Sequence, residues 1–340
     1  MKNPVGNRVR LGIHVVLVWC TASINCWAQE ANKASTDSQI TATQLQFGLD
    51  ANQPLMQRVG GTPESVLAIF RDAGMSPKPY SLNEQDRQKL SEAISILPPL
   101  HQSVLKQRLR TISLVTDMPN TALTSAVNPD DSNCLFDITI RAVILKQSAA
   151  EWLVEKESSC FNSTNSSFSL RAEVGNITAI QYVLLHEATH IVDAALEITP
   201  SLRSRPGGVL LENVTPFTAT VWEDARTPAR RYQDEGLMAI RFRPGGRVLE
   251  ASKMKGLCEA LAQTPFVSLY GSAAQTEDIA EYLTVYHLTQ ELHQPYRIHV
   301  YDGEKRIFTH DPMASELTRR RFELMKKFYD SEYIEKSNRK

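Results

Sequence analysis

Residues 178–196 read TAIQYVLLHEATHIVDAAL, and this stretch decides how the rest of the sequence is interpreted. Thr178 followed by Gln181 has the spacing of a capping box, in which two side chains at a helix start satisfy backbone N–H groups reciprocally. Apolar residues then recur at helical intervals until Pro200, which lacks the N–H that a further turn would need. The stretch therefore predicts one mostly buried helix over residues 178–196.

This predicted helix carries the motif H-E-x-x-H as His186-Glu187-Ala188-Thr189-His190. Residues four apart differ by about 400° around an α-helix, so both imidazoles leave the same face and can share one metal ion. Two such histidines supply half of a zinc site, and Glu187 lies on the flank, where a carboxylate can act as general base on a metal-bound water. In the alternative interpretation both histidines are hydrogen-bonded core residues and Glu187 is a surface carboxylate. A third ligand is therefore required.

A second window, residues 270–283, supplies candidates for that ligand. Glu277 and Glu281 are four apart in a segment expected to be helical, so both carboxylates face the same way. One can bind the metal while the other orients a ligating histidine through its second ring nitrogen. Three protein ligands and an open position for water are what a catalytic zinc site requires. The alternative is an ordinary pair of acids on a helix surface.

Together the two windows resemble the gluzincin metallopeptidases, and most nearly the catalytic domain of anthrax toxin lethal factor. That pattern has H-E-x-x-H-x-x-D and, later, a Tyr-Gly pair seven residues ahead of E-x-x-A-E. Here residues 186–193 match the first part, and Tyr270-Gly271 with residues 277–281 match the second at the same internal spacing. The resemblance covers these two short windows.

The resemblance implies metal ligands and catalytic groups. His186, His190 and Glu277 would bind one zinc ion per chain, and Glu187 would be the general base. Tyr270 would stabilise the oxyanion with its hydroxyl, although it could also be merely packed against its neighbours.

The resemblance also implies two partners that orient the ligands, Asp193 and Glu281. Asp193 could itself bind the metal, as in zincins with an acidic ligand close to the helix. It follows His190 by only three residues, however, without the intervening turn that such a ligand needs. The other histidines of the C-terminal part are assigned no role, and they are His287, His293, His299 and His310.

Residues 1–28 have the three parts of a secretory signal peptide. Lys2, Arg8 and Arg10 form a basic start, a short apolar run follows, and small residues precede the expected cleavage point. The run is too short to cross a bilayer, and retention as an N-terminal anchor is the alternative. We therefore expect an exported protein, periplasmic or secreted, without a stable membrane anchor after cleavage. Residues 29–44 are small and polar, which predicts a flexible leader.

Charge and cysteine content narrow the function classes. The 340-residue chain has 37 Lys and Arg against 38 Asp and Glu, and loss of the signal peptide removes three of the basic residues. The mature chain is mildly acidic without long runs of one charge, which argues against a nucleic-acid partner. Cys134, Cys160 and Cys258 remain in it. Three cysteines allow at most one disulfide bond, for which Cys134 and Cys160 are the candidates.

The overall pattern predicts an α+β, zincin-like fold. Residues 45–110 are interpreted as a helical N-terminal region and residues 111–340 as the catalytic domain. Within that domain, a small strand-containing lobe over residues 111–176 would pack beside the H-E-x-x-H helix. A mainly helical lobe over residues 197–340 would supply Glu277 and Tyr270 across a cleft.

Individual elements are also predicted. β-branched residues indicate strands over residues 111–115 and 135–145, with a loop over residues 120–133 between them. Residues 296–309 have two strand-like halves around an Asp-Gly pair, which predicts a hairpin. A charged helix is expected over residues 312–329.

The predicted function is zinc-dependent hydrolysis of peptide bonds in a protein or peptide substrate, by a zinc-activated water with Glu187 as general base. Two alternatives belong to other classes. One is a zinc hydrolase acting on a non-peptide or cell-wall amide, and the other is a non-catalytic binding protein on a zincin scaffold. Glu187 counts against the second, because a purely structural zinc site does not need it.

Overall fold

The computed structural model describes residues 42–129, 133–200, 202–205, 208–211 and 214–337, which form a mixed α+β fold. The expected signal peptide and most of the expected leader lie outside these residues. Residues 42–46, at the end of the leader region, are helical, and the Gln44 side chain donates a hydrogen bond to the Gln107 carbonyl at 3.2 Å. The leader prediction is therefore wrong at its last three residues, which contact the folded part of the chain.

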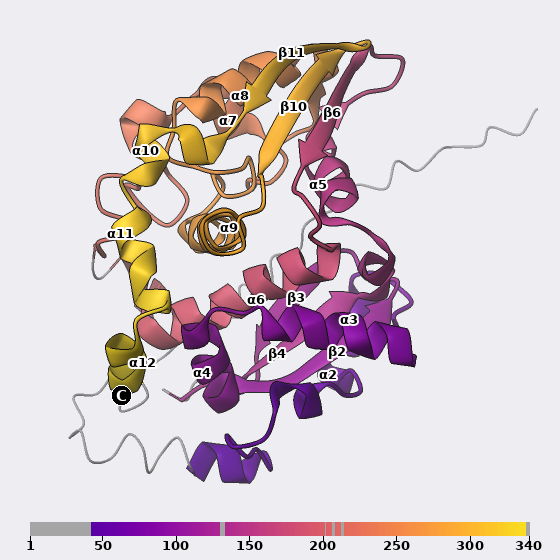
Figure 1. Ribbon diagram of the computed structural model, residues 1–340, viewed down its shortest axis with the longest axis vertical. Helices are drawn as coiled ribbons and strands as arrows, with labels where there is room; N and C mark the ends of the chain where they lie inside the picture. Colours follow the sequence, from indigo (N-terminus) through magenta and orange to yellow (C-terminus); the bar gives the residue numbers. More distant parts are fainter. Residues whose placement is uncertain (1–41, 130–132, 201, 206–207, 212–213, 338–340) are drawn as a thin grey trace, which may run out of the picture.

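Helix α6 (Ala179–Leu196) lies at the centre of the molecule (Figure 1) and confirms the helix predicted for residues 178–196. Thr178 and Gln181 form the predicted capping box. The Thr178 hydroxyl accepts from the Gln181 N–H, and the Gln181 side chain accepts from the Thr178 N–H at 2.9 Å. The helix ends at Glu197, whose left-handed conformation (φ 49°) stops the regular hydrogen bonding.

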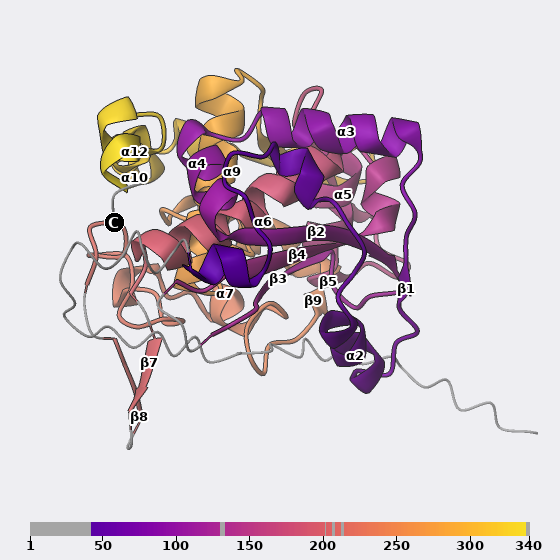
Figure 2. The ribbon, with the colours of Figure 1, turned by 90° about the horizontal axis from the view of Figure 1, so that it is seen from below.

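A four-stranded sheet lies beside α6. Its order is β1 (Lys78–Pro79), β2 (Leu109–Thr116), β4 (Phe136–Arg141), β3 (Ala122–Ala126), with β2 and β4 parallel and β3 antiparallel at the edge. Helices α3 (Glu84–Ser95), α4 (Pro99–Arg108) and α6 lie on one side of this sheet, and α2 (Glu64–Asp72) lies on the other (Figure 2). Successive side chains of β2 point to opposite faces of the sheet, so the strand contributes apolar residues to both sides. Leu114 packs in the main core, and Val115 packs with α2.

A second sheet forms the upper part of the molecule in Figure 1. It has the order β11 (Lys305–His310), β10 (Arg297–Asp302), β6 (Phe168–Glu173), with antiparallel neighbours throughout. The β10–β11 hairpin was predicted and is confirmed, and Gly303 takes the positive φ (56°) that its turn needs. Helices α7 (Glu235–Ala239) and α8 (Met254–Ala262) contribute to a second apolar core packed against this sheet.

Helix α9 (Gln275–Tyr286) lies between these two parts and packs against α6 (Figure 1). Its residues from Glu277 to Tyr286 are all buried, so the helix is an interior element. Carboxylates on α9 can therefore face the histidines of α6 away from bulk water.

The remaining elements are short connections around these layers. They are η1 (Leu55–Arg58), η2 (Ala142–Lys146), α5 (Ala149–Ser158), β5 (Phe161–Asn162), β7 (Leu202–Arg205), β8 (Gly208–Leu211), η3 (Arg230–Tyr232), β9 (Leu249–Glu250), η4 (Ala251–Lys253), η5 (His287–Glu291), η6 (Pro312–Ala314), α10 (Glu316–Arg319), α11 (Phe322–Met325), η7 (Lys326–Phe328) and α12 (Ser331–Ser337). Within the described ranges, no helix is both long and apolar enough to cross a membrane.

Three element predictions were wrong, at least in part. The strand expected over residues 135–145 ends with β4 at Arg141, and the 3-10 helix η2 follows it. The loop expected over residues 120–133 contains strand β3, whose sequence ALTSA has little intrinsic preference for a strand and is held by pairing with β4. The single helix expected over residues 312–329 is a series of short turns, with α10 and α11 as its α-helical parts.

The proposed division into lobes also needs correction. Strand β6, assigned to the first lobe, pairs with β10 of the C-terminal part, so the two parts share a sheet. The N-terminal helices α3 and α4 pack directly on α6 and share its core, so they do not form a separate region.

The predicted disulfide between Cys134 and Cys160 is not formed, and both residues are buried, as is Cys258. Cys134 belongs to the main core beside the first sheet, whereas Cys160 belongs to the second core, below the second sheet. The two segments are neighbours in sequence, but they point into different cores.

Candidate metal centre

His186 and His190 project from one face of α6, as their spacing predicts. Their rings meet edge to face with centroids 4.9 Å apart, and their Nε2 atoms are 3.2 Å apart. His186 is buried, while the His190 side chain keeps 21% of its surface exposed. The pair therefore has one interior member and one member in contact with solvent.

Glu277, in the first turn of α9, completes the group. Its Oε2 atom is 3.2 Å from His186 Nε2 and 3.6 Å from His190 Nε2. Three ligand-type atoms from two helices thus converge on one point and could hold a metal ion. Among the described residues, this is the only group of three or more His, Cys, Asp or Glu side chains with such an arrangement.

The protonation of these groups reflects their mutual attraction. Burial alone would lower the pKa of His186, but Glu277 and Glu281 raise it to about 10. Burial would likewise raise the pKa of Glu277, but the imidazoles of His190 and His186 hold it well below its usual value. The surroundings of His186, His190 and Glu277 therefore favour a positive charge between the three side chains. A metal ion would compete with protons for the histidine nitrogen atoms.

Glu281, one turn further along α9, lies behind His186. Its Oε1 atom is 3.0 Å from His186 Nδ1. Its Oε2 atom accepts hydrogen bonds from Ser268 Oγ (2.6 Å), Lys156 Nζ (2.8 Å) and Tyr182 Oη (3.1 Å). A carboxylate beside Nδ1 keeps the proton on that nitrogen, so the Nε2 lone pair faces Glu277 and His190. The spacing of Glu277 and Glu281 had predicted that one of them would orient a ligating histidine through its second ring nitrogen.

Glu187 is buried on the flank of the histidine face. Thr124 of strand β3 donates a hydrogen bond to Glu187 Oε2 at 2.6 Å. Burial lowers the pKa of His190, but the charge of Glu277 and, to a smaller extent, that of Glu187 raise it. The carboxylate is thus held beside the three converging atoms without being one of them.

Tyr270 covers the other side of His186. The two rings stack with centroids 5.8 Å apart and an interplanar angle of 25°. Burial raises the pKa of the Tyr270 phenol, as do the carboxylates of Glu277, Glu187 and Glu281, so the hydroxyl remains protonated. A neutral phenol that is partly exposed beside the histidines can donate a hydrogen bond to a ligand.

The Tyr-Gly pair has a steric explanation. A Cβ atom at Gly271 would lie 3.3 Å from both Glu281 Cβ and Ser268 Oγ, which is tighter than most real contacts. The Gly271 N–H also donates to Ser268 Oγ at 3.0 Å. The absence of a side chain therefore lets the turn that carries Tyr270 approach α9 closely.

Asp193 has a different partner from the one that its predicted role suggests. Its carboxylate accepts hydrogen bonds from the Thr199 N–H (2.6 Å) and the Thr199 hydroxyl (2.7 Å). These contacts fix the chain as it leaves α6. Any effect of Asp193 on the histidines is electrostatic or passes through the helix.

Sequence reasoning missed the side chains that support the site, namely Thr124, Lys156, Tyr182 and Ser268. Thr124 lies in a segment predicted to be a loop. Lys156 lies 125 residues before Glu281 in the sequence, and no local pattern marks that pairing. Such partners become visible only when the chain is folded.

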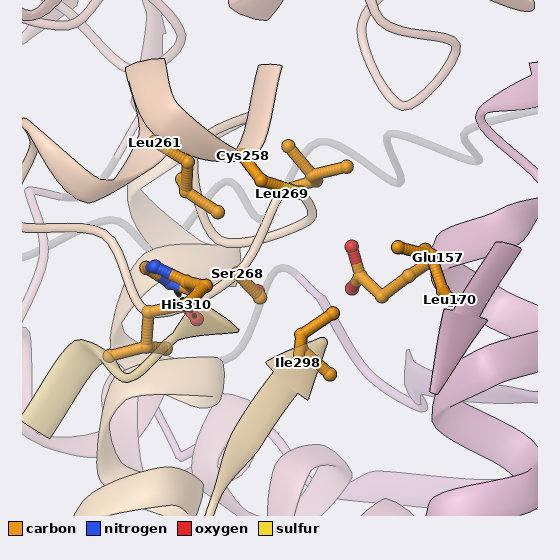
Figure 3. A pocket seen from close by; sticks show the side chains of 9 residues that line it. Glu157, Leu170, Cys258, Leu261, Ser268, Leu269, Ile298 and His310 are labelled. Carbon is orange, nitrogen blue, oxygen red and sulfur yellow. Dashed lines mark hydrogen bonds between the residues drawn. The ribbon is translucent and has the colours of Figure 1, made fainter. Parts of the chain in front are cut away.

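Figure 3 shows a small cavity that is lined in part by Ser268, one of these supporting side chains. Its walls include Glu157, Ser268 and His310, and none of the three candidate metal ligands lines it. Burial raises the pKa of Glu157 to about 7, against the lowering effect of the nearby Lys156. Two of its lining residues adjoin the contacts that support the centre: Ser268 donates to Glu281, and Glu157 follows Lys156 in α5.

Comparisons of the chain with protein families, with curated proteins and with solved structures gave no match. The functional interpretation therefore depends on the residues and geometry of the centre itself.

Proposed function

We propose that this protein is an exported, zincin-like zinc hydrolase that cleaves peptide bonds. The observation that carries the proposal is the convergence of His186 Nε2, His190 Nε2 and Glu277 Oε2, with separations of 3.2, 3.2 and 3.6 Å. In a tetrahedral zinc site with bonds of about 2.1 Å, ligand atoms lie roughly 3.4 Å apart. The three atoms have the spacing of three corners of such a site.

The donor set favours zinc over other common ions. Two imidazole nitrogens and one carboxylate oxygen suit zinc, whereas calcium and magnesium prefer oxygen ligands alone. Within the described residues no fourth His, Cys, Asp or Glu joins the group. Three protein ligands with an open fourth position are typical of catalytic rather than structural zinc sites.

Glu187 would act as the general base. Bound zinc lowers the pKa of a coordinated water towards about 7, which makes that water a nucleophile at neutral pH. Glu187 would accept the water's proton during attack on the scissile carbonyl and later return it to the leaving amine. Its hydrogen bond from Thr124 at 2.6 Å supports this role, because it fixes the direction of the carboxylate.

Tyr270 would donate a hydrogen bond to the oxygen that becomes negatively charged. Its raised pKa keeps the phenol protonated for this purpose. The stack on His186 holds the ring at one side of the centre, and the partial exposure of Tyr270 lets the hydroxyl meet a substrate.

Strand β3 favours a peptide as the substrate. It is the edge of its sheet in the described part of the chain, all of its residues are half-buried, and it packs against α6. Thr124, in the middle of β3, contacts Glu187. An extended peptide could pair with this edge through backbone hydrogen bonds and so pass beside the catalytic groups.

The proposal is tested with the purified mature chain and a mixed peptide library, with and without a metal chelator. We expect chelator-sensitive cleavage that zinc restores, and we expect Glu187→Gln to keep zinc while losing turnover. Cleavage by Glu187→Gln at the wild-type rate would refute the mechanism. Chelator-sensitive hydrolysis of cell-wall amides without cleavage of any peptide would instead identify the other hydrolase class.

A further inference from the structure

We infer that Lys156 is a positioning residue for the metal centre, acting on His186 through Glu281. This inference rests on the proposed zinc site, which it deepens by adding the charge that keeps the site's supporting carboxylate in place. Lys156 is in α5, outside both windows that carry the sequence motif.

The surroundings of the Lys156 ammonium are unusual for a lysine. Only 11% of the side chain is exposed, although lysine is almost never buried without a partner. Its Nζ atom is 2.8 Å from Glu281 Oε2 and 3.5 Å from Glu157 Oε1. The ammonium also lies 5.0 to 5.6 Å from the ring centroids of three aromatic residues, which are Trp152, Tyr270 and Tyr182.

This environment keeps both charges in place. Glu281 is completely buried, so its negative charge needs a nearby positive one. Lys156 supplies that charge, with its Nζ atom 2.8 Å from Glu281 Oε2. Burial would lower the pKa of Lys156, but Glu281 and Glu157 keep it raised. Lys156 is therefore the cation that permits a charged carboxylate behind His186.

The second carboxylate oxygen of Glu281, Oε1, faces the His186 ring. Oε1 lies 3.0 Å from His186 Nδ1, and neither atom has another hydrogen-bond partner among the described residues. While Glu281 is anionic, it holds a proton on Nδ1, directs the Nε2 lone pair towards the metal position and makes the imidazole a stronger donor. Without Lys156, Glu281 Oε2 would lose one of its three hydrogen-bond donors and the only cationic one, and the direction of Oε1 towards Nδ1 would be less well fixed.

Lys156 also lies close to the aromatic ring of Tyr270. Its Nζ atom lies 5.3 Å from the Tyr270 centroid, and Tyr270 stacks on His186. One ammonium therefore supports both the carboxylate behind the histidine and the aromatic ring beside it. The simpler alternative is that Lys156 only stabilises packing between α5 and α9.

The test measures zinc affinity of the full mature chain at neutral pH by competition with a chromophoric chelator. Lys156→Met keeps the apolar stem and removes the charge, and we expect its zinc Kd to rise about 10- to 100-fold, as for other partners of metal ligands. Lys156→Arg should restore most of the affinity. A folded Lys156→Met protein with wild-type zinc affinity overturns the inference. If that variant does not fold, Lys156→Gln replaces it, with the same expected direction and the same contradicting result.

A double variant separates positioning from packing. If Lys156 acts through Glu281, adding Lys156→Met to Glu281→Gln should cause no further loss of zinc affinity, whereas independent effects would add. Lys89→Met is the matched control, because Lys89 is also a half-buried lysine and its Nζ atom donates to the Leu145 carbonyl at 2.7 Å. An equal loss in Lys89→Met would mean that any half-buried lysine has this effect, which overturns the inference. A wild-type chain without zinc affinity would instead refute the proposed function.

Discussion

The hydroxyl of Thr124 and the carboxylate of Glu187 illustrate how single residues determine the proposed activity. Their 2.6 Å hydrogen bond fixes the direction of the carboxylate that we propose as general base. Hydrogen bonds to charged groups are typically worth about 1.5–3 kcal/mol. The effect of Thr124 should therefore fall on turnover and not on metal binding.

We predict that Thr124→Val lowers kcat by about 10- to 100-fold, because the base loses its hydrogen-bond donor while the shape of the side chain is kept. Zinc content should be unchanged. Thr124→Ser, which keeps the hydroxyl, is the control and should retain most activity. Steady-state kinetics on a cleaved peptide measures the effect, and equal kcat values for Thr124→Val and wild type would contradict it.

Tyr270→Phe should also leave the metal in place and reduce turnover. Loss of one donor to a developing oxyanion typically costs about 3 kcal/mol, or roughly 100-fold in kcat. The Phe ring can still stack on His186, so folding should be preserved. Comparison of kcat with zinc content in the same preparations tests this, and full activity in Tyr270→Phe would remove the phenol from the mechanism.

At the scale of elements, α6 connects folding to the centre, because it carries both histidines and packs against α9, α3 and α4. Its start is fixed by the Thr178 and Gln181 capping box. Disturbing this cap should weaken the whole core, since the helix has no other side-chain cap at that end.

We predict that Thr178→Ala lowers the free energy of unfolding by about 1 kcal/mol, the usual cost of losing an N-cap side chain. Thr178→Ser keeps the capping oxygen and should be close to wild type. Urea unfolding followed by circular dichroism measures both variants. Equal stability of Thr178→Ala and Thr178→Ser would mean that the cap contributes nothing.

The elements that were predictable from sequence are those with local signals. The helix at residues 178–196 and the hairpin around Gly303 were confirmed because capping, periodicity and turn chemistry are encoded in adjacent residues. Strand β3 was missed because its pairing with β4, and not its own composition, makes it a strand. The disulfide prediction failed because sequence distance does not reveal which core a cysteine enters.

The candidate site also has one part that could be predicted from the sequence and one part that could not. Spacing along a helix predicted that His186 and His190 share a face, and the paired acids of α9 face them. The supporting contacts of Lys156 and Thr124 join distant segments, so they could not be predicted from local patterns.

At the scale of the whole molecule, buried histidines make stability depend on pH. Burial lowers the pKa of His101 to about 3, and those of His287 and His310 to about 4. His101 Nε2–H donates to Thr189 Oγ1 at 3.0 Å, whose hydroxyl donates to the Leu185 carbonyl, so a second ring proton would find no partner. The folded protein therefore keeps these rings neutral.

The direction of the pH effect follows from proton binding. Below the ordinary histidine pKa of 6.5 the unfolded chain binds these three protons and the folded protein does not, so stability falls as the pH decreases. Glu157 has the opposite effect on stability between its folded pKa of about 7 and its ordinary pKa of 4.5. As the pH falls through this range, the folded protein binds the Glu157 proton at a higher pH than the unfolded chain does. His186 and His190 also oppose the loss of stability, because the raised pKa values of both rings let the folded protein hold these protons at pH 7, whereas the unfolded chain takes them up only near 6.5. The net effect corresponds to about one histidine.

We predict that the metal-free protein is about 2 kcal/mol less stable at pH 5 than at pH 7, by urea unfolding in the presence of chelator. His101→Gln, which keeps a donor to Thr189, should reduce this difference because one fewer proton is involved. A free energy of unfolding at pH 5 that equals or exceeds the value at pH 7 would show that the buried histidines do not determine how stability depends on pH.

The proposed zinc site is tested most directly by elemental analysis of the purified wild-type protein and of Glu277→Ala, side by side. We expect about one zinc ion per wild-type chain, since one group of three ligands is present among the described residues, and a large loss in the variant because one of those ligands is removed. A wild-type protein without bound metal, or a Glu277→Ala protein with a full complement of zinc, would contradict it.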